Sequence, residues 1–154
     1  MDTVTPTQLS PASGTYQPKG QLIGGKWIGS VSGKLIKIEN PGKKTSIAQV
    51  PHAGAADVEL AVAAAEKAFP SWKNVVPRER GKLLLKIAEA MEARVEEMAR
   101  TIAMETGNAL RTQARGEAKL AADIFRYFGG LASELKGETV PLGESVLSYT
   151  RREP

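Results

Sequence analysis

The residues from Pro77 to Gly107 predict one long amphipathic helix, and such a helix needs a partner surface. Its apolar residues recur at steps of three and four, so they share one side of the helix: Leu84, Ile87, Ala88, Met91, Val95, Met98 and Ile102. Pro77 suits a first helical turn, and Gly107 suits the position after the last one. The pattern is typical of a helix that faces a core, and it indicates no chemistry by itself.

The residues before this helix predict strands and turns. Gln21 to Ser30 predicts a hairpin because Gly24 and Gly25 separate two short apolar runs. Leu35 to Ile38 and Ile47 to Val50 predict two further strands on either side of an Asn-Pro-Gly turn. Residues 1–20 are rich in Thr, Pro, Ser and Gly, and this composition predicts a flexible leader.

Two more helices and a second hairpin are predicted around the central helix. Ala55 to Phe69 has a helical period and is expected to end at Phe69-Pro70, with Trp72 filling a gap between helices. Ala109 to Leu135 predicts a third helix with an apolar stripe broad enough to touch two surfaces. Val140 to Tyr149 predicts a hairpin around Gly143 and Glu144.

Composition excludes several kinds of function within these 154 residues. The sequence has no cysteine, which excludes disulfides and a thiol nucleophile, and its one histidine, His52, is expected in a surface loop. The net charge of +4 is mild and mixed with acidic residues, so no nucleic acid partner is expected. The sequence shows neither a membrane-spanning apolar run nor a signal peptide, so we expect no membrane partner and a cytoplasmic location.

Six segments, in order, resemble the N-terminal part of the NAD(P)-dependent aldehyde dehydrogenase superfamily. They are LIGGKWIGS, IENPGKK, AAEKAFPSWKN, the central helix up to GNAL, FRYFGGLASELKGETVPL and SYTRREP. The likeness covers about Leu22 to Pro154. It implies an α/β fragment of the aldehyde dehydrogenase type, with an N-terminal β-hairpin, three amphipathic helices and a C-terminal β-hairpin. Residues 21–154 would form the N-terminal part of the cofactor-binding domain and the start of the oligomerisation arm.

The resemblance implies that the full-length enzyme oxidises an aldehyde to a carboxylic acid with NAD or NADP. A cysteine thiolate would attack the aldehyde, an amide and a backbone N–H would hold the oxyanion, hydride would pass to the nicotinamide, and a carboxylate would activate water. The family's catalytic Cys, Glu and Asn positions all follow the segment that this chain resembles. The chain alone is therefore expected to be inactive and to bind no cofactor, and to form a homo-oligomer or bind a protein partner. The alternative is a stand-alone helical interaction module of the same ancestry that docks on another protein.

Five residues are implied as site residues of the full-length enzyme. Glu105 matches a carboxylate that, in several family members, binds a monovalent cation together with a backbone carbonyl, here near Ile38; the alternative is a helix-terminal glutamate in water. The third helix lines the substrate tunnel in many relatives, and Gly116, Leu120 and Ile124 would face it. Leu120 and Ile124 also fit a core stripe, which is the other interpretation.

Overall fold

The described residues form an α/β fragment of three separate two-stranded hairpins and four α-helices. The computed structural model describes residues 20–153, so the predicted leader lies outside the described residues except for Gly20. β1 (Gln21–Ile23) pairs with β2 (Lys26–Ile28), and β3 (Leu35–Asn40) pairs with β4 (Thr45–Pro51). β5 (Thr139–Pro141) pairs with β6 (Leu147–Tyr149). All three pairs are antiparallel.

The turns form where the sequence predicts them. Gly24 and Gly25 have φ values of 58° and 78°, the backbone that a two-residue hairpin turn requires and that glycine adopts without strain. In the turn between β3 and β4, the side-chain oxygen of Asn40 accepts hydrogen bonds from the N–H groups of Gly42 and Lys43, each at 3.0 Å. The predicted strands around this turn are confirmed, and both are longer than expected.

Helix α1 (Ala55–Trp72) continues past the proline that was expected to end it. Pro70 lies in the last turn, where a missing N–H and the ring cost less than in the middle of a helix. The N–H of Lys73 still donates to the carbonyl of Phe69 at 2.9 Å, so the turn closes around Pro70. The helix therefore ends at Trp72, two residues after Pro70, and the predicted end at Phe69-Pro70 is wrong.

The predicted central helix is two helices, α2 (Pro77–Glu92) and α3 (Val95–Thr106). The interruption lies at Arg94, whose φ of −120° and ψ of 18° leave the helical region. Its carbonyl then accepts the N–H of Met98 and begins α3. The apolar period continues in phase across this break, so periodicity alone could not reveal it. Gly107 adopts a left-handed conformation with φ of 78°, which confirms the predicted end.

The predicted third helix begins later than expected. A π-helical turn covers Leu110–Ala114, α4 runs over Arg115–Leu131, and a short 3₁₀ helix covers Ala132–Glu134. Small residues, Ala114, Ala118, Ala122 and Gly129, form the buried side of this segment. The described chain therefore has four α-helices where three were expected, because the central helix divides.

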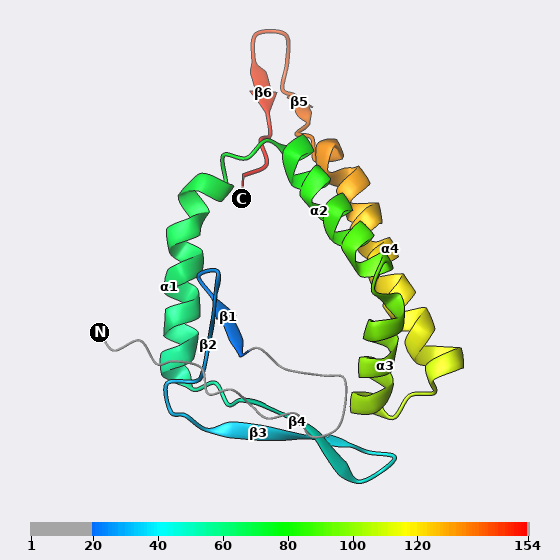
Figure 1. The fold of residues 1–154 in the computed structure, drawn as a ribbon. Coiled ribbons are helices and arrows are strands. Elements are labelled where there is room, and N and C mark those ends of the chain that lie inside the picture. The colour runs from blue at the N-terminus through cyan, green and yellow to red at the C-terminus, as the bar shows by residue number, and fades with distance from the viewer. Residues whose placement is uncertain (1–19, 154) are drawn as a thin grey trace.

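Helices α2 and α4 pack side by side (Figure 1) and touch most closely at two glycines. A methyl group added to Gly81 would lie 2.6 Å from the backbone oxygen of Gly129, and one added to Gly129 would lie 3.1 Å from the oxygen of Gly81. Such distances leave no room for a side chain. The two helix backbones therefore meet at this crossing.

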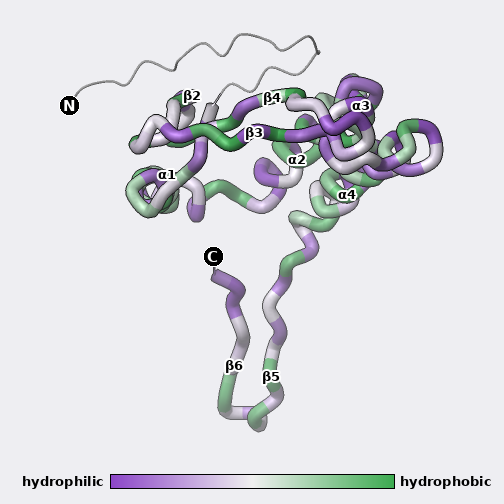
Figure 2. Tube along the Cα trace, turned by 90° about the horizontal axis from the view of Figure 1, so that it is seen from below, coloured by the Kyte–Doolittle hydropathy of each residue, from purple (hydrophilic) through white to green (hydrophobic). Residues whose placement is uncertain are grey.

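The described residues enclose no large apolar core. The buried apolar side chains are all alanines: Ala48, Ala88, Ala99, Ala114, Ala118 and Ala122. In Figure 1, α1 lies on one side and α2, α3 and α4 on the other, with β3 and β4 running between them below. Figure 2 shows the β5–β6 hairpin extending away from the helices. Leucines, valines and aromatic residues remain exposed along this open frame.

Candidate functional site

An apolar hollow of about 650 Å³ lies between α2 and the end of α4. We call it the α2–α4 hollow, and the residues that line it are Trp72, Arg80, Leu83, Leu84, Lys86, Ile87, Phe128, Ala132 and Leu135. Trp72 was expected to fill a gap between helices; it does lie against α2 but is still half-exposed. The hollow offers an apolar surface to a partner. The charged side chains in its lining are those of Arg80 and Lys86, and it contains no carboxylate or histidine.

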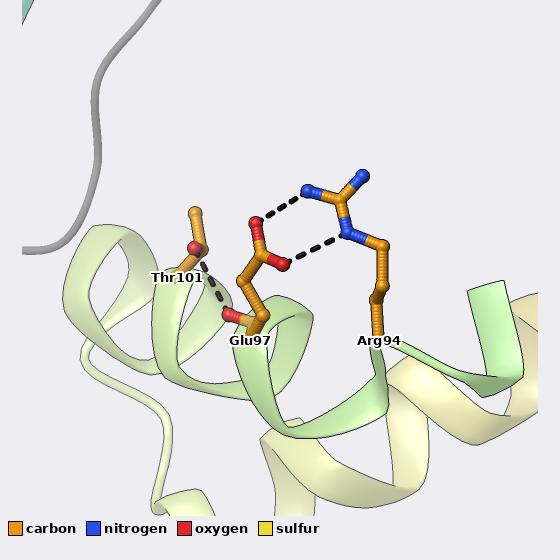
Figure 3. Close-up of polar contacts among 3 residues, drawn as sticks. All are labelled: Arg94, Glu97 and Thr101. Carbon is orange, nitrogen blue, oxygen red and sulfur yellow. Dashed lines mark hydrogen bonds and ion pairs between the residues drawn. The ribbon is translucent and has the colours of Figure 1, made fainter. Parts of the chain in front are cut away.

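A second, smaller groove of about 360 Å³ lies at the junction of α2 and α3. Methionine and isoleucine side chains, Met91, Met98 and Ile102, form part of its lining. Figure 3 shows Arg94 and Glu97 facing each other beside it, with Nε to Oε2 at 2.8 Å and a second bond at 2.6 Å. Arg94 lowers the pKa of the Glu97 carboxyl through these bonds. Each charge already has a partner, so the pair has little left to offer a ligand.

The three predicted tunnel residues share one exposed face of α4. Gly116, Leu120 and Ile124 follow each other at four-residue steps, which places them in one row along the helix. Leu120 is 58% exposed and Ile124 is 46% exposed. An added methyl group on Gly116 would meet nothing within 4 Å. These side chains are not buried by the described residues, and both the tunnel role and the core interpretation stay predictions for the full-length enzyme.

The two predicted cation ligands lie on neighbouring elements. Glu105 is exposed in the last turn of α3, and Ile38 is half-buried in β3. α3 contacts β3, and Pro41, just after β3, lies beside Gly107. Among residues 20–153 no group of three His, Cys, Asp or Glu side chains gathers, and the predicted monovalent site would instead use one carboxylate and backbone carbonyls. The cation site therefore stays a prediction for the full-length enzyme.

Two ion pairs tie α4 to its neighbours. Arg126 donates to Glu92 of α2 at 2.6 Å, and Arg115 donates to both carboxylate oxygens of Glu96 of α3. Arg115 lowers the pKa of the Glu96 carboxyl, chiefly through this side-chain hydrogen bond. Both pairs are partly exposed, so they orient the helices rather than bury charge.

No catalytic group arrangement occurs in the part of the chain that the structure describes. His52 is exposed just after β4, as predicted. Residues 20–153 contain antiparallel hairpins but no parallel sheet, whose strand ends are where dinucleotides commonly bind. None of the described helices has the length and apolar character needed to cross a membrane. The features that the described residues do present are the apolar hollow and the exposed helix faces.

Sequence reasoning missed the features that shape these surfaces. The α2–α4 hollow depends on the crossing of Gly81 and Gly129, which are 48 positions apart in the sequence. Local patterns do not relate residues at that separation. The nearest available signal was Trp72, a large apolar residue in a loop region, and it does mark one end of the hollow.

Comparison with known proteins identifies what this frame is similar to. The family model described as "Aldehyde dehydrogenase family" matches residues 27–154. An aldehyde dehydrogenase of Aspergillus niger is 39% identical over 139 residues, which are 90% of this chain and 28% of that protein.

Solved structures agree with the sequence comparison. The crystal structure of PnpE in complex with nicotinamide adenine dinucleotide matches 86% of this chain with a TM-score of 0.81 and 40% identity. A variant aldehyde dehydrogenase from Bacillus cereus matches 90% of this chain with a TM-score of 0.85 and 29% identity. The chain spans 27% and 28% of those two chains.

Proposed function

Because the chain belongs to the aldehyde dehydrogenase family, we propose that it is the N-terminal part of an enzyme that oxidises an aldehyde to a carboxylic acid. The observation that carries this proposal is the match of nearly the whole chain to about 28% of an aldehyde dehydrogenase. The cofactor of the whole enzyme is NAD or NADP, which the NAD complex of the similar PnpE supports.

The exposed apolar faces support this assignment. Leu83, Ile87 and Phe128 line the α2–α4 hollow while remaining exposed to solvent. Exposed apolar surface of this extent normally marks an interface. We infer that the remaining portion of the enzyme covers these faces and supplies the thiol, the general base and the dinucleotide site. This chain alone then binds no cofactor and performs no oxidation.

The same exposed faces also suit the second candidate function, a stand-alone module that docks on a partner protein. The two candidates differ in the coding sequence that follows Pro154. By the resemblance, family members continue after the SYTRREP segment into a Gly-Val-rich strand and a Pro-Trp-Asn motif. A reading frame that encodes these two features favours the enzyme, whereas a genuine stop codon favours the module.

A chimera tests the proposed function. We expect activity when residues 22–154 replace the matched segment of the Aspergillus niger enzyme, which is 39% identical to this chain. The measurement is aldehyde-dependent formation of reduced NAD or NADP, with the 154-residue chain alone and the truncated fungal enzyme alone as controls. We expect both controls to be inactive. A chimera that is folded and binds cofactor but oxidises no aldehyde would contradict the proposal, as would activity of the chain alone.

Within the whole enzyme, the exposed face of α4 contributes to the substrate tunnel. Gly116 leaves space for the substrate, and the side chains of Leu120 and Ile124 form part of the apolar wall of the tunnel. This assignment derives from the family resemblance, and their exposure on a single helix face supports it.

Glu105 contributes to a monovalent cation site in the whole enzyme, together with the carbonyl of Ile38. We expect Glu105→Gln in the chimera to lower the melting temperature by about 1 °C more in sodium or potassium buffer than in a bulky organic-cation buffer, the shift that roughly 1 kcal/mol of lost binding gives in a chain of the whole enzyme's length. Thermal melts of both proteins in both buffers measure this difference. Equal shifts in the two buffers would argue against the site.

A further inference from the structure

Two polar side chains are buried in the described part of the chain, and both lie where the N-terminal hairpin meets α1. Asp57 is 2% exposed and Ser30 is 3% exposed. Ser30 donates from its hydroxyl to the carbonyl of Lys34 at 3.0 Å, and the same carbonyl accepts the N–H of His52 at 2.8 Å. The junction therefore joins the loop after β2 to both ends of the β3–β4 hairpin.

The carboxylate of Asp57 accepts hydrogen bonds from three separate segments. Oδ2 accepts the N–H of Gly54 at 2.8 Å, which caps the start of α1. Oδ1 accepts the N–H of Val31 at 2.9 Å and the side-chain amide of Gln21 at 3.2 Å. These bonds, with Gly54 and then Val31 contributing most, lower the pKa of the Asp57 carboxyl. The group is therefore an acceptor on both oxygens.

Few apolar contacts duplicate this attachment. The α1 side chains Val58, Leu60 and Val62 are each about half-exposed. Gly24, in the hairpin turn, lies beside Ala64 of α1, where a methyl group added to the glycine would be 3.8 Å from the alanine Cβ. Ile23 and Ile28 of the hairpin are only partly buried, so the fully buried contacts at this junction are the polar ones.

We propose that Asp57 is a latch that fastens the β1–β2 hairpin and the loop after it to the start of α1. One carboxylate ties Gln21 in β1, Val31 in the loop and Gly54 before the helix, so removing it releases all three at once. The α2–α4 pair, which Asp57 does not touch, keeps its structure. The latch is a property of this chain's own residues and does not depend on the enzyme assignment.

Amide hydrogen exchange of the 154-residue chain tests the latch. We expect Asp57→Ala to raise the exchange rates of the Val31 and Gly54 amides and of residues 21–28 by about tenfold or more, the effect of losing hydrogen bonds to a charged acceptor. Residues 77–92 and 115–131 should exchange as in the unaltered chain. Glu59→Ala, which removes an exposed carboxylate from the same helix, is the matched control and should change neither region.

A milder variant covers the case in which Asp57→Ala fails to fold. Gln21→Ala removes one of the three donors, so we expect faster exchange in residues 21–28 while Gly54 stays protected. The latch is overturned if Asp57→Ala leaves residues 21–31 as protected as Glu59→Ala does. It is equally overturned if both variants at the junction accelerate exchange in α2 and α4 as much as in the hairpin.

Discussion

Replacing Gly81 with alanine is expected to destabilise the paired helices α2 and α4 by about 1–3 kcal/mol, the usual cost of forcing a methyl group into a packed contact. Alanine is the better helix former, so helix propensity alone predicts the opposite sign. We expect the steric contact to outweigh helix propensity, because the new methyl group would lie 2.6 Å from the backbone oxygen of Gly129. A backbone atom inside a helix cannot move aside without separating the two helices.

Two neighbouring glycines provide matched controls for this prediction. Gly130→Ala adds a methyl group that meets nothing within 4 Å, so we expect it to stabilise the helices by about 0.5–1 kcal/mol through propensity. The stability change of Gly129→Ala should lie between those of Gly81→Ala and Gly130→Ala, because the contacts of its methyl group at 3.1 Å include the flexible side chain of Leu85. Thermal melts followed by the helix signal in circular dichroism rank the stabilities of the three variants. Equal shifts for Gly81→Ala and Gly130→Ala would contradict the close crossing.

The hairpins could be predicted because their turns depend on local chemistry. The pair Gly24 and Gly25 supplies two positive φ values, and Asn40 supplies a side-chain acceptor for its own turn. Gly107 ends α3 for the same kind of reason. Such requirements fall on one or two adjacent residues, so the sequence displays them directly.

The helix boundaries were harder to predict because tertiary contacts and small dihedral changes decide them. The break at Arg94 leaves the apolar period intact, and α1 passes Pro70 because only its last turn is affected. The buried side of α4 consists of alanines and a glycine, whereas its larger residues Leu120 and Ile124 are exposed. A hydrophobicity pattern ranks leucine above alanine and therefore selects the wrong face of α4 for the α2 contact.

The candidate site could be predicted only in part. Resemblance to a family placed Gly116, Leu120 and Ile124 on one helix, and their spacing already put them on one face. The α2–α4 hollow joins Trp72 to side chains of two helices that are far apart in sequence. Asp57, three residues after Gly54, has the spacing of a helix N-terminal cap, but the bonds to Val31 and Gln21 depend on the fold.

The isolated chain is expected to self-associate rather than to behave as a stable monomer. Leu83, Ile87, Phe128 and Leu135 are each roughly half-exposed around the α2–α4 hollow. A fully buried side chain of this kind contributes about 1.5–3 kcal/mol, so covering these four and Trp72 completely would add roughly 4–8 kcal/mol. That gain is comparable with the whole stability of about 5–15 kcal/mol that a typical domain has.

The C-terminal hairpin adds a second reason for association. Leu147 is 81% exposed and Tyr149 is 69% exposed in β6, which pairs only with β5 among the described strands. Hairpins of two strands are marginally stable in water, and an open apolar edge invites another strand. A chain with Ile87→Gln and Phe128→Gln should associate less than the unaltered chain. The matched control, Glu59→Gln on the exposed side of α1, should associate as before.

Size-exclusion chromatography with light scattering, combined with a thermal melt, tests most directly whether this chain lacks a core of its own. We expect species heavier than the 16.4 kDa monomer, a broad melting transition, and a shift toward the monomer mass in the doubly substituted variant. A monodisperse monomer with a sharp cooperative transition would contradict this expectation, because the helices would then close a core without any further part of an aldehyde dehydrogenase.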